Sequence, residues 1–150
     1  MKMVSASTEN RPVRVWILDV DRWGDTQQMR TLAEATPGVK YEVLRLTPRN
    51  GYPKLRRLPR HDISWLDARS RALLMPPWPD AVFLAGRTAV SVALWIRRQH
   101  PPTRLVAFGR PFSPFRLFDL VITNPAYFPP QRPNILCLKA PLHLLDGEKL

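Results

Sequence analysis

The chain has 150 residues, of which 45% are hydrophobic, and its 23 Lys and Arg against 12 Asp and Glu give a formal charge of +11. Chains of this length bury roughly 70% of the surface that the unfolded form exposes, so we expect one basic domain with a real core and no second domain. The 17 prolines and 6 glycines stay below the content of about 25–30% that marks low-complexity disorder, which is therefore excluded.

Short apolar runs alternate with amphipathic stretches along the chain. This alternation is typical of parallel strands that are buried on both faces and joined by crossover helices. The predicted strands are Val13–Asp19, Lys40–Leu46, Ala81–Ala85, Arg104–Phe108 and Asp119–Thr123, followed by a short run at Asn134–Leu138. We expect residues 1–12 to be a flexible N-terminus, residues 13–145 to form the domain, and residues 146–150 to be a tail.

Two helices are predicted between these strands, over Asp25–Thr36 and Gly86–His100, because apolar residues recur there at helical spacing and proline follows each segment. A third helix is expected over Asp62–Leu74, with Asp62 or Ser64 as its N-cap. This third helix falls within a basic, proline-rich excursion that runs from residue 47 to residue 79.

Right-handed crossovers arrange such a chain as an α/β fold, a Rossmann-like doubly wound parallel sheet of about five to six strands. Ligands of such sheets bind beyond the carboxyl ends of the strands. The loops that follow the strands are therefore the expected place for a functional site.

The loop after the first strand contains Asp21, Arg22, Trp23, Gly24 and Asp25. Gly24 would let a ligand approach the backbone, Arg22 would bind an anion, and Trp23 would offer a stacking platform. Asp21 or Asp25 would act as a general base. The alternative is a plain turn in which Asp25 or Thr26 caps the next helix and an Asp and an Arg form a salt bridge.

Two later strands are each followed by glycine and arginine. Gly86, Arg87 and Thr88 open a helix, where unpaired amides and the positive end of the helix dipole attract anions. Gly109 and Arg110 repeat this arrangement after the next strand. We expect the two arginines to bind an anionic substrate, the alternative being that Arg87 pairs with a nearby carboxylate.

Several other kinds of site lack the residues that they need. G-x-G-x-x-G and the P-loop pattern are absent, so no nucleotide cofactor is expected. One cysteine and three separated histidines provide no metal-ligand spacing, and G-x-S-x-G is missing, which argues against a metal site and a hydrolase. His61 would either face a substrate from the basic excursion or lie on the surface.

Four tryptophans and the single cysteine lie at apolar positions of the sequence and are predicted to be core residues: Trp16, Trp65, Trp78, Trp95 and Cys137. Because Cys137 is the single cysteine, no internal disulfide can form, and an oxidising compartment is not indicated. The polar first twelve residues lack a signal-peptide pattern, and no apolar run approaches the roughly 20 residues that span a bilayer. We expect a cytoplasmic protein, either free or peripheral at a membrane.

Arginine accounts for 18 of the 23 cations. Its planar fork suits bidentate binding of phosphate or carboxylate, although a GC-rich genome would also raise arginine and proline together. The charge leaves open nucleic acid, anionic lipid and a phosphorylated small molecule as partners. No helix-turn-helix, zinc-finger or RNA-platform motif is present, so nucleic acid is the least favoured of the three.

Five motifs in their order along the chain resemble the mitochondrial fission Elm-type family. They are Val15-Trp16-Ile17-Leu18 with Asp21-Arg22-Trp23-Gly24-Asp25 and Gln28; Ala85-Gly86-Arg87-Thr88-Ala89; Gly109-Arg110-Pro111; Phe118-Asp119-Leu120-Val121-Ile122-Thr123 with Pro125 and Tyr127; and Pro133-Asn134-Ile135-Leu136. The resemblance covers residues 13 to about 145.

The resemblance implies a fold like the glycosyltransferase B class, in which two Rossmann-like halves face a cleft, in a family found in plants and many bacteria. The chain resembles the N-terminal half only, and in that architecture the first half usually binds the acceptor while the second holds the sugar nucleotide. It implies a phosphorylated or acidic acceptor bound by Arg22, Arg87 and Arg110. A second chain would carry the donor-binding half, or the chain is a truncated or remnant domain.

A noncatalytic adaptor is the competing function, because a fold does not imply an activity. In this alternative the basic stretch from Arg45 to Arg71 docks on an anionic membrane surface or an acidic protein partner. Arg56, Arg57 and Arg60 would carry the docking, and the arginines after the strands would play no part in it.

Overall fold

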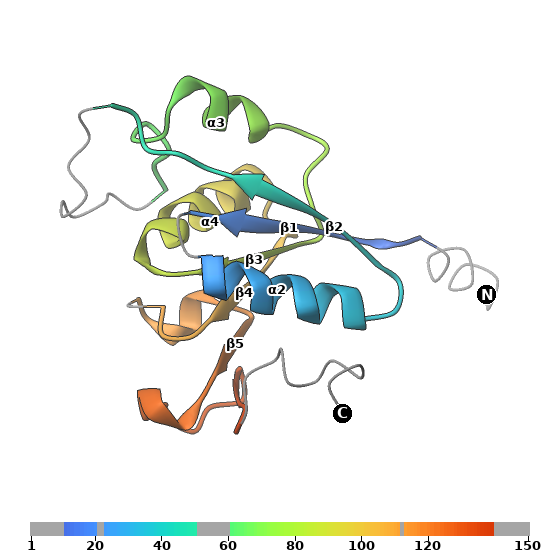
Figure 1. Ribbon diagram of the computed structural model, residues 1–150, viewed down its shortest axis with the longest axis vertical. Coiled ribbons are helices and arrows are strands. Elements are labelled where there is room, and N and C mark those ends of the chain that lie inside the picture. Colours follow the sequence, from blue (N-terminus) through green and yellow to red (C-terminus); the bar gives the residue numbers. More distant parts are fainter. Residues whose placement is uncertain (1–10, 21–22, 51–60, 112, 140–150) are drawn as a thin grey trace.

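Six parallel strands form one sheet in the order β2-β1-β3-β4-β5-β6 (Figure 1). This computed structural model describes residues 11–20, 23–50, 61–111 and 113–139, and for residues 23 and 24 the backbone alone. The strands are β1 (Val13–Asp19), β2 (Val39–Arg45), β3 (Ala81–Ala85), β4 (Arg104–Phe108), β5 (Leu120–Thr123) and β6 (Ile135–Cys137). The helices are α2 (Trp23–Ala35), α3 (Ala68–Leu73) and α4 (Arg87–Gln99), and two 3₁₀ turns are η1 (Phe115–Leu117) and η2 (Pro125–Tyr127).

The predicted α/β fold with a Rossmann-like parallel sheet is confirmed. β1 lies inside the sheet, where Ile17 pairs with Val43 of β2 on one side and with Phe83 of β3 on the other. The chain therefore leaves β1 toward one edge and returns across it to build the rest of the sheet. β1, β3 and β4 have the predicted bounds, while β2 begins one residue earlier and β5 one residue later than predicted.

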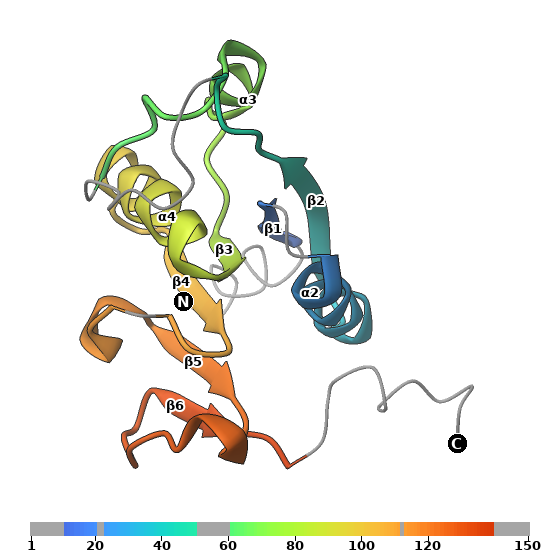
Figure 2. The same cartoon turned by 60° about the vertical axis from the view of Figure 1, so that its left-hand side comes forward.

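Successive residues of β1 serve two separate cores. Trp16 and Leu18 belong to the cluster that packs with α4, whereas Val15 and Ile17 belong to the cluster that packs with α2. Figure 2 shows α2 and α4 on opposite sides of the sheet. Strands buried on both faces need apolar residues at consecutive positions, which explains why β1 appears in the sequence as a nearly continuous apolar run.

α3 is shorter than predicted, and its predicted caps are wrong. The helix spans Ala68–Leu73, and Asp67 is the N-cap, its carboxylate accepting a hydrogen bond of 2.8 Å from the Ser70 N–H. The residues before it pair with the chain that follows β2, because the Asp67 N–H donates to the Thr47 carbonyl and the Arg49 N–H to the Trp65 carbonyl, both at 2.9 Å. These tertiary bonds replace the helical bonds that the longer helix would need.

α2 begins two residues earlier than predicted, at Trp23, so Asp25 lies in the first turn of the helix rather than at its N-cap. The acidic side chain still lies at the favourable end of the helix dipole.

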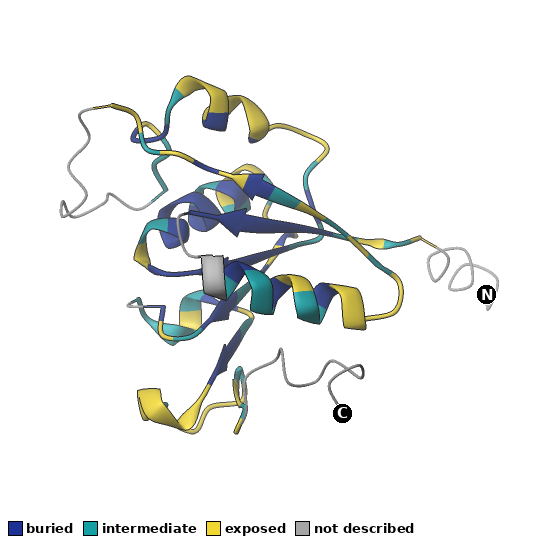
Figure 3. Ribbon diagram, in the orientation of Figure 1, coloured by how far each residue is buried: buried dark blue, intermediate teal, exposed yellow. Residues whose placement is uncertain are grey.

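The predicted core is correct at some positions and wrong at others (Figure 3). Trp16 and Trp65 are buried. Trp78 and Trp95 are half-buried and pack against the core, with ring centroids 5.9 Å apart. Cys137 is exposed, contrary to prediction. It belongs to β6, whose outer edge has no further strand beside it among the described residues.

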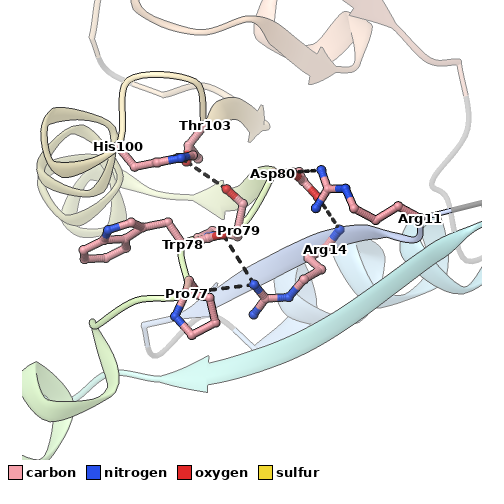
Figure 4. Close-up of polar contacts among 8 residues, drawn as sticks. All are labelled: Arg11, Arg14, Pro77, Trp78, Pro79, Asp80, His100 and Thr103. Carbon is pink, nitrogen blue, oxygen red and sulfur yellow. Dashed lines mark hydrogen bonds and ion pairs between the residues drawn. The ribbon is translucent and has the colours of Figure 1, made fainter. Parts of the chain in front are cut away.

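Asp80 joins β1 to the start of β3 (Figure 4). Its carboxylate accepts hydrogen bonds from the Arg14 N–H at 2.9 Å and from the Arg11 guanidinium at 2.8 Å. Burial by itself raises the pKa of Asp80, but these hydrogen bonds and the charges of the two arginines outweigh it and lower the pKa below the ordinary 3.8. The ionised carboxylate is therefore favoured by the fold.

We expect Asp80→Asn to lower the free energy of unfolding at pH 7 by about 1–3 kcal/mol, because hydrogen bonds to a charged acceptor are lost. A depressed folded pKa contributes stability above the unfolded pKa of about 3.9, and this stability is lost as the pH falls through the lower folded pKa. Urea unfolding at pH 7, 5 and 3 should show the gap between wild type and variant narrowing with acid. Glu42→Gln, at an exposed position of β2, is the control, and a gap that stays constant with pH would contradict this account.

Candidate functional site at the carboxyl ends of the strands

The strands end along one edge of the sheet. Ala85 pairs with Phe108, Phe108 pairs with Ile122, and Thr123 pairs with Cys137, so the residues that follow these strands start from neighbouring positions. β3 and β4 are each followed directly by a glycine with positive φ, +86° at Gly86 and +81° at Gly109. L residues with a side chain rarely adopt this conformation, which explains glycine at both strand ends.

Asp19, the last residue of β1, fixes the position of α2. Its side chain is buried on the α2 face, where Oδ1 accepts a hydrogen bond of 3.2 Å from the Thr26 hydroxyl. Its Oδ2 lies 3.5 Å from Nε of Arg45 at the end of β2. Sequence reasoning missed Asp19, although a carboxylate at the end of an apolar strand was a usable signal.

A cavity of about 390 Å³ lies between the start of α2 and the ends of β4 and β5. α2 contributes Asp25 and Gln28, and the other side is formed by Gly109, Thr123 and Tyr127 among others. Its size falls at the lower end of the range of small-molecule sites. Its polar lining consists of one carboxylate and one ammonium group, Asp25 and Lys139, together with side-chain amides and the Tyr127 ring, a set that suits a polar group without net charge.

A smaller hollow of about 160 Å³ adjoins this cavity and shares Gly109, Thr123 and Tyr127 with it. Its remaining border is Arg110 with an apolar wall of Phe115, Phe128, Pro129 and Pro130. The two spaces differ in their charged residues, because Asp25 and Lys139 border the larger one and Arg110 the smaller one.

The structure places the predicted site residues in different parts of this edge. Asp25 borders the larger cavity, Arg110 the smaller hollow, and Gly109 both. The other predicted strand-end residues, Gly86, Arg87 and Thr88, form the start of α4 and border neither space.

Other predicted residues cannot be placed at this edge. The side chains of Asp21, Arg22, Arg56, Arg57 and Arg60 lie outside the described residues, as does the side chain of Trp23. Gly24 is part of α2. The ring of His61 is half-buried, with Nδ1 3.2 Å from the carbonyl oxygen of Leu94 in α4.

Four further residues of this edge were missed by sequence reasoning as site residues: Gln28, Thr123, Asn124 and Tyr127. Asn124 is the N-cap of η2, since its Oδ1 accepts a hydrogen bond of 2.9 Å from the Ala126 N–H. Thr123 is distinctive because its buried Oγ1 has no hydrogen-bond partner among the described residues. An asparagine followed by proline at the end of a strand is a usable signal for Asn124, whereas Thr123 gives none.

Among the residues that the structure describes, no group of three or more His, Cys, Asp or Glu is placed to hold a metal ion. A membrane crossing would need a long apolar helix, and the described segments contain none.

The topology defines a Rossmann-like α/β domain, with two adjoining cavities at the carboxyl edge of its sheet. The family model Mitochondrial fission ELM1 matches residues 24–150, so the chain belongs to that family. The match begins within α2 and includes β2 to β6. No curated protein and no solved structure matches the chain.

We expect Gly109→Ala to lower the free energy of unfolding by about 1–2 kcal/mol through backbone strain, because the residue has positive φ. An added Cβ would lie 3.8 Å from the Tyr127 Oη, an ordinary contact, so packing should add nothing. Gly38→Ala is the matched control, with φ of +80° and no atom within 4 Å of an added Cβ. Urea unfolding should give equal losses for the two variants, and a much larger loss for Gly109→Ala would contradict the open space at this position.

Proposed function

We propose that this chain is the acceptor-side domain of a glycosyltransferase-like protein, and that it binds a phosphorylated or acidic acceptor at the carboxyl edge of its sheet. A second domain or a separate chain supplies the sugar-nucleotide donor. Membership of the family, with the glycosyltransferase B-like fold that the sequence motifs imply, supports this proposal. The absence of both glycine-rich phosphate motifs agrees with a donor site elsewhere.

The main support for the proposal is that two neighbouring strands are followed by the same arrangement of residues. β3 and β4 are adjacent, and each ends in a glycine with positive φ followed by an exposed arginine, Arg87 or Arg110. At the first of these ends, α4 has no acidic residue in its first turn and no side-chain cap at Gly86. The positive end of the dipole and the arginine forks together favour an oxyanion.

Asp25 is the described carboxylate that borders the larger cavity. In the proposed reaction it accepts the proton of an acceptor hydroxyl while that oxygen bonds to the anomeric carbon of the donor sugar. The bond from the anomeric carbon to the nucleotide diphosphate breaks, and the diphosphate leaves with the electron pair. Asp21, which lies outside the described residues, is the alternative base.

We expect the double variant Arg87→Ala/Arg110→Ala to bind inorganic phosphate more weakly by about 10–100-fold, since a hydrogen bond to a charged group contributes about 1.5–3 kcal/mol. Titration followed by ¹H–¹⁵N NMR measures the dissociation constant. Arg98→Ala is the control, because Arg98 is an exposed arginine in the last turn of the same helix, α4. Equal binding by the double variant and the control would contradict an anion site at this edge.

In this proposal, sugar transfer depends on a donor-binding half supplied by a second domain or a separate chain. We expect the isolated chain to be inactive with sugar nucleotides and to gain activity when a chain carrying a donor-binding half is added. Transfer of a radiolabelled sugar, measured with and without candidate partner chains, checks this. Activity of the chain by itself would overturn the divided arrangement.

A second function, an adaptor that docks on an anionic membrane surface, is favoured by the surface around α3. Leu73 is 42% exposed and Met75 60% exposed, beside the exposed cations Arg69 and Arg71. Apolar side chains flanked by cations are the composition that binds anionic lipid surfaces.

If the chain is such an adaptor, alanine at Arg56, Arg57 and Arg60 should abolish binding to vesicles of phosphatidylserine and phosphatidylcholine, and Leu73→Ser/Met75→Ser should weaken it. Vesicle sedimentation measures the bound fraction. Arg87→Ala and Arg110→Ala should leave it unchanged. No sedimentation of the wild type at low salt would rule the adaptor out.

A further inference from the structure

The last residue of β5 contains a buried hydroxyl without a partner. Thr123 is 5% exposed, and its Oγ1 makes no hydrogen bond within the described residues. A buried hydroxyl that lacks a hydrogen bond destabilises the fold. Such a group in a native structure needs an explanation, and a ligand that completes the hydrogen bond is one.

Thr103 is a second buried threonine, and its hydroxyl is hydrogen-bonded within the fold, so it serves as the comparison for Thr123. It is 1% exposed and lies at the opposite edge of the sheet (Figure 4). Its hydroxyl donates to the Pro79 carbonyl at 2.8 Å and lies 2.9 Å from Nδ1 of His100. Thr123 is also buried, but its hydroxyl lacks such bonds among the described residues.

The alternation of side chains along β5 places the Thr123 side chain on the same face of the sheet as the smaller hollow. Val121 belongs to the core on the α4 face and Ile122 to the core on the α2 face, so alternation puts Thr123 on the α4 face. Phe115, which borders the smaller hollow, packs against the same α4-face core. Arg110 borders this hollow as well.

The backbone at this end of β5 has few donors to offer a ligand. The Ala126 N–H donates to Asn124 Oδ1 and the Tyr127 N–H to the Asn124 carbonyl, while Pro125 has no N–H. We therefore expect side chains to supply the hydrogen bonds to a ligand in the hollow. The side-chain donors that border it are the Arg110 guanidinium, with five N–H groups, and the hydroxyls of Thr123 and Tyr127.

We propose that Thr123 Oγ1 and the Arg110 guanidinium together bind the oxyanion of the acceptor in the smaller hollow, and that the uncharged part of the acceptor lies in the larger cavity. The inference rests on the proposed function and assigns its anion to the ends of β4 and β5 rather than to the start of α4. Rotation about χ1 between staggered positions turns the Thr123 hydroxyl toward the anion.

The charged residues of the two spaces differ. Asp25 and Lys139, which have opposite charges, border the larger cavity, whereas Arg110 is the charged residue at the described border of the smaller hollow and attracts an anion into it. The hydroxyl groups of the acceptor then lie on the Asp25 side, where the proposed base needs them.

Thr123→Val tests the assignment because it removes the hydroxyl and keeps the shape. We expect it to weaken binding of inorganic phosphate about tenfold, equivalent to 1.4 kcal/mol, with Arg110→Ala weakening it at least as much. Thr123→Ser should restore binding, and Arg98→Ala, an exposed arginine in the last turn of α4 that borders neither space, should retain it. A parallel titration with acetate distinguishes a phosphate site from a carboxylate site, and binding of either anion that depends on Thr123 supports the proposal.

Thermal unfolding without ligand supplies a second readout. Thr123→Val should keep or raise Tm, since it removes an unpaired buried hydroxyl, whereas the matched Thr103→Val should lower Tm by about 2–4 °C. A fall in Tm for Thr123→Val like that of Thr103→Val would overturn the proposal, because the hydroxyl would then have a structural partner.

The binding results separate this inference from the proposed function. Phosphate binding that is lost in Arg87→Ala and unchanged in Thr123→Val overturns the inference and leaves an anion site at α4, as the proposed function allows. If neither anion binds the wild type, the inference is overturned, and the sugar-transfer assay with partner chains still decides the proposed function.

Discussion

The parallel pairing of β1 with both β2 and β3 is the constraint on which the other features depend. Parallel neighbours need crossover connections, and right-handed crossovers on the two sides of β1 place their helices on opposite faces of the sheet. α2 covers one face and α4 the other, so β1 must be apolar toward both. The same pairing brings every carboxyl end to one edge, where the residues after β3, β4 and β5 become neighbours.

The two edges of the sheet have different chemistry. At the amino edge, a carboxylate just before a strand accepts the backbone N–H of the neighbouring strand: Asp80 from Arg14, and Asp119 from Leu105. These internal bonds satisfy the polar groups of that edge within the fold. At the carboxyl edge, β3 and β4 are followed by glycines with positive φ, and the buried Thr123 hydroxyl has no hydrogen-bond partner among the described residues. In parallel α/β sheets this is the edge at which ligands bind.

The net charge does not identify the partner of this chain, whereas the positions of individual arginines indicate what each surface can bind. The +11 of the whole chain is compatible with several anionic partners. Arg110 beside a hydroxyl and an apolar wall supports one small oxyanion, and Arg69 and Arg71 beside exposed Leu73 and Met75 support a lipid surface. These two surfaces lie on different elements, which allows variants to test the acceptor function and the adaptor function separately.

The sequence by itself determined the strands and the parallel α/β fold, because burial on both faces demands apolar runs whose ends are marked by proline and glycine. It also indicated the glycine and arginine pairs after β3 and β4. The length of α3 depended on bonds from residues 65–67 to residues 47–49, and the exposure of Cys137 on its place at a sheet edge. Only the tertiary structure decided that Asp25 and Arg110 border adjoining spaces and that the Thr123 hydroxyl is left unpaired, because hydrogen-bond satisfaction depends on contacts between residues far apart in the chain.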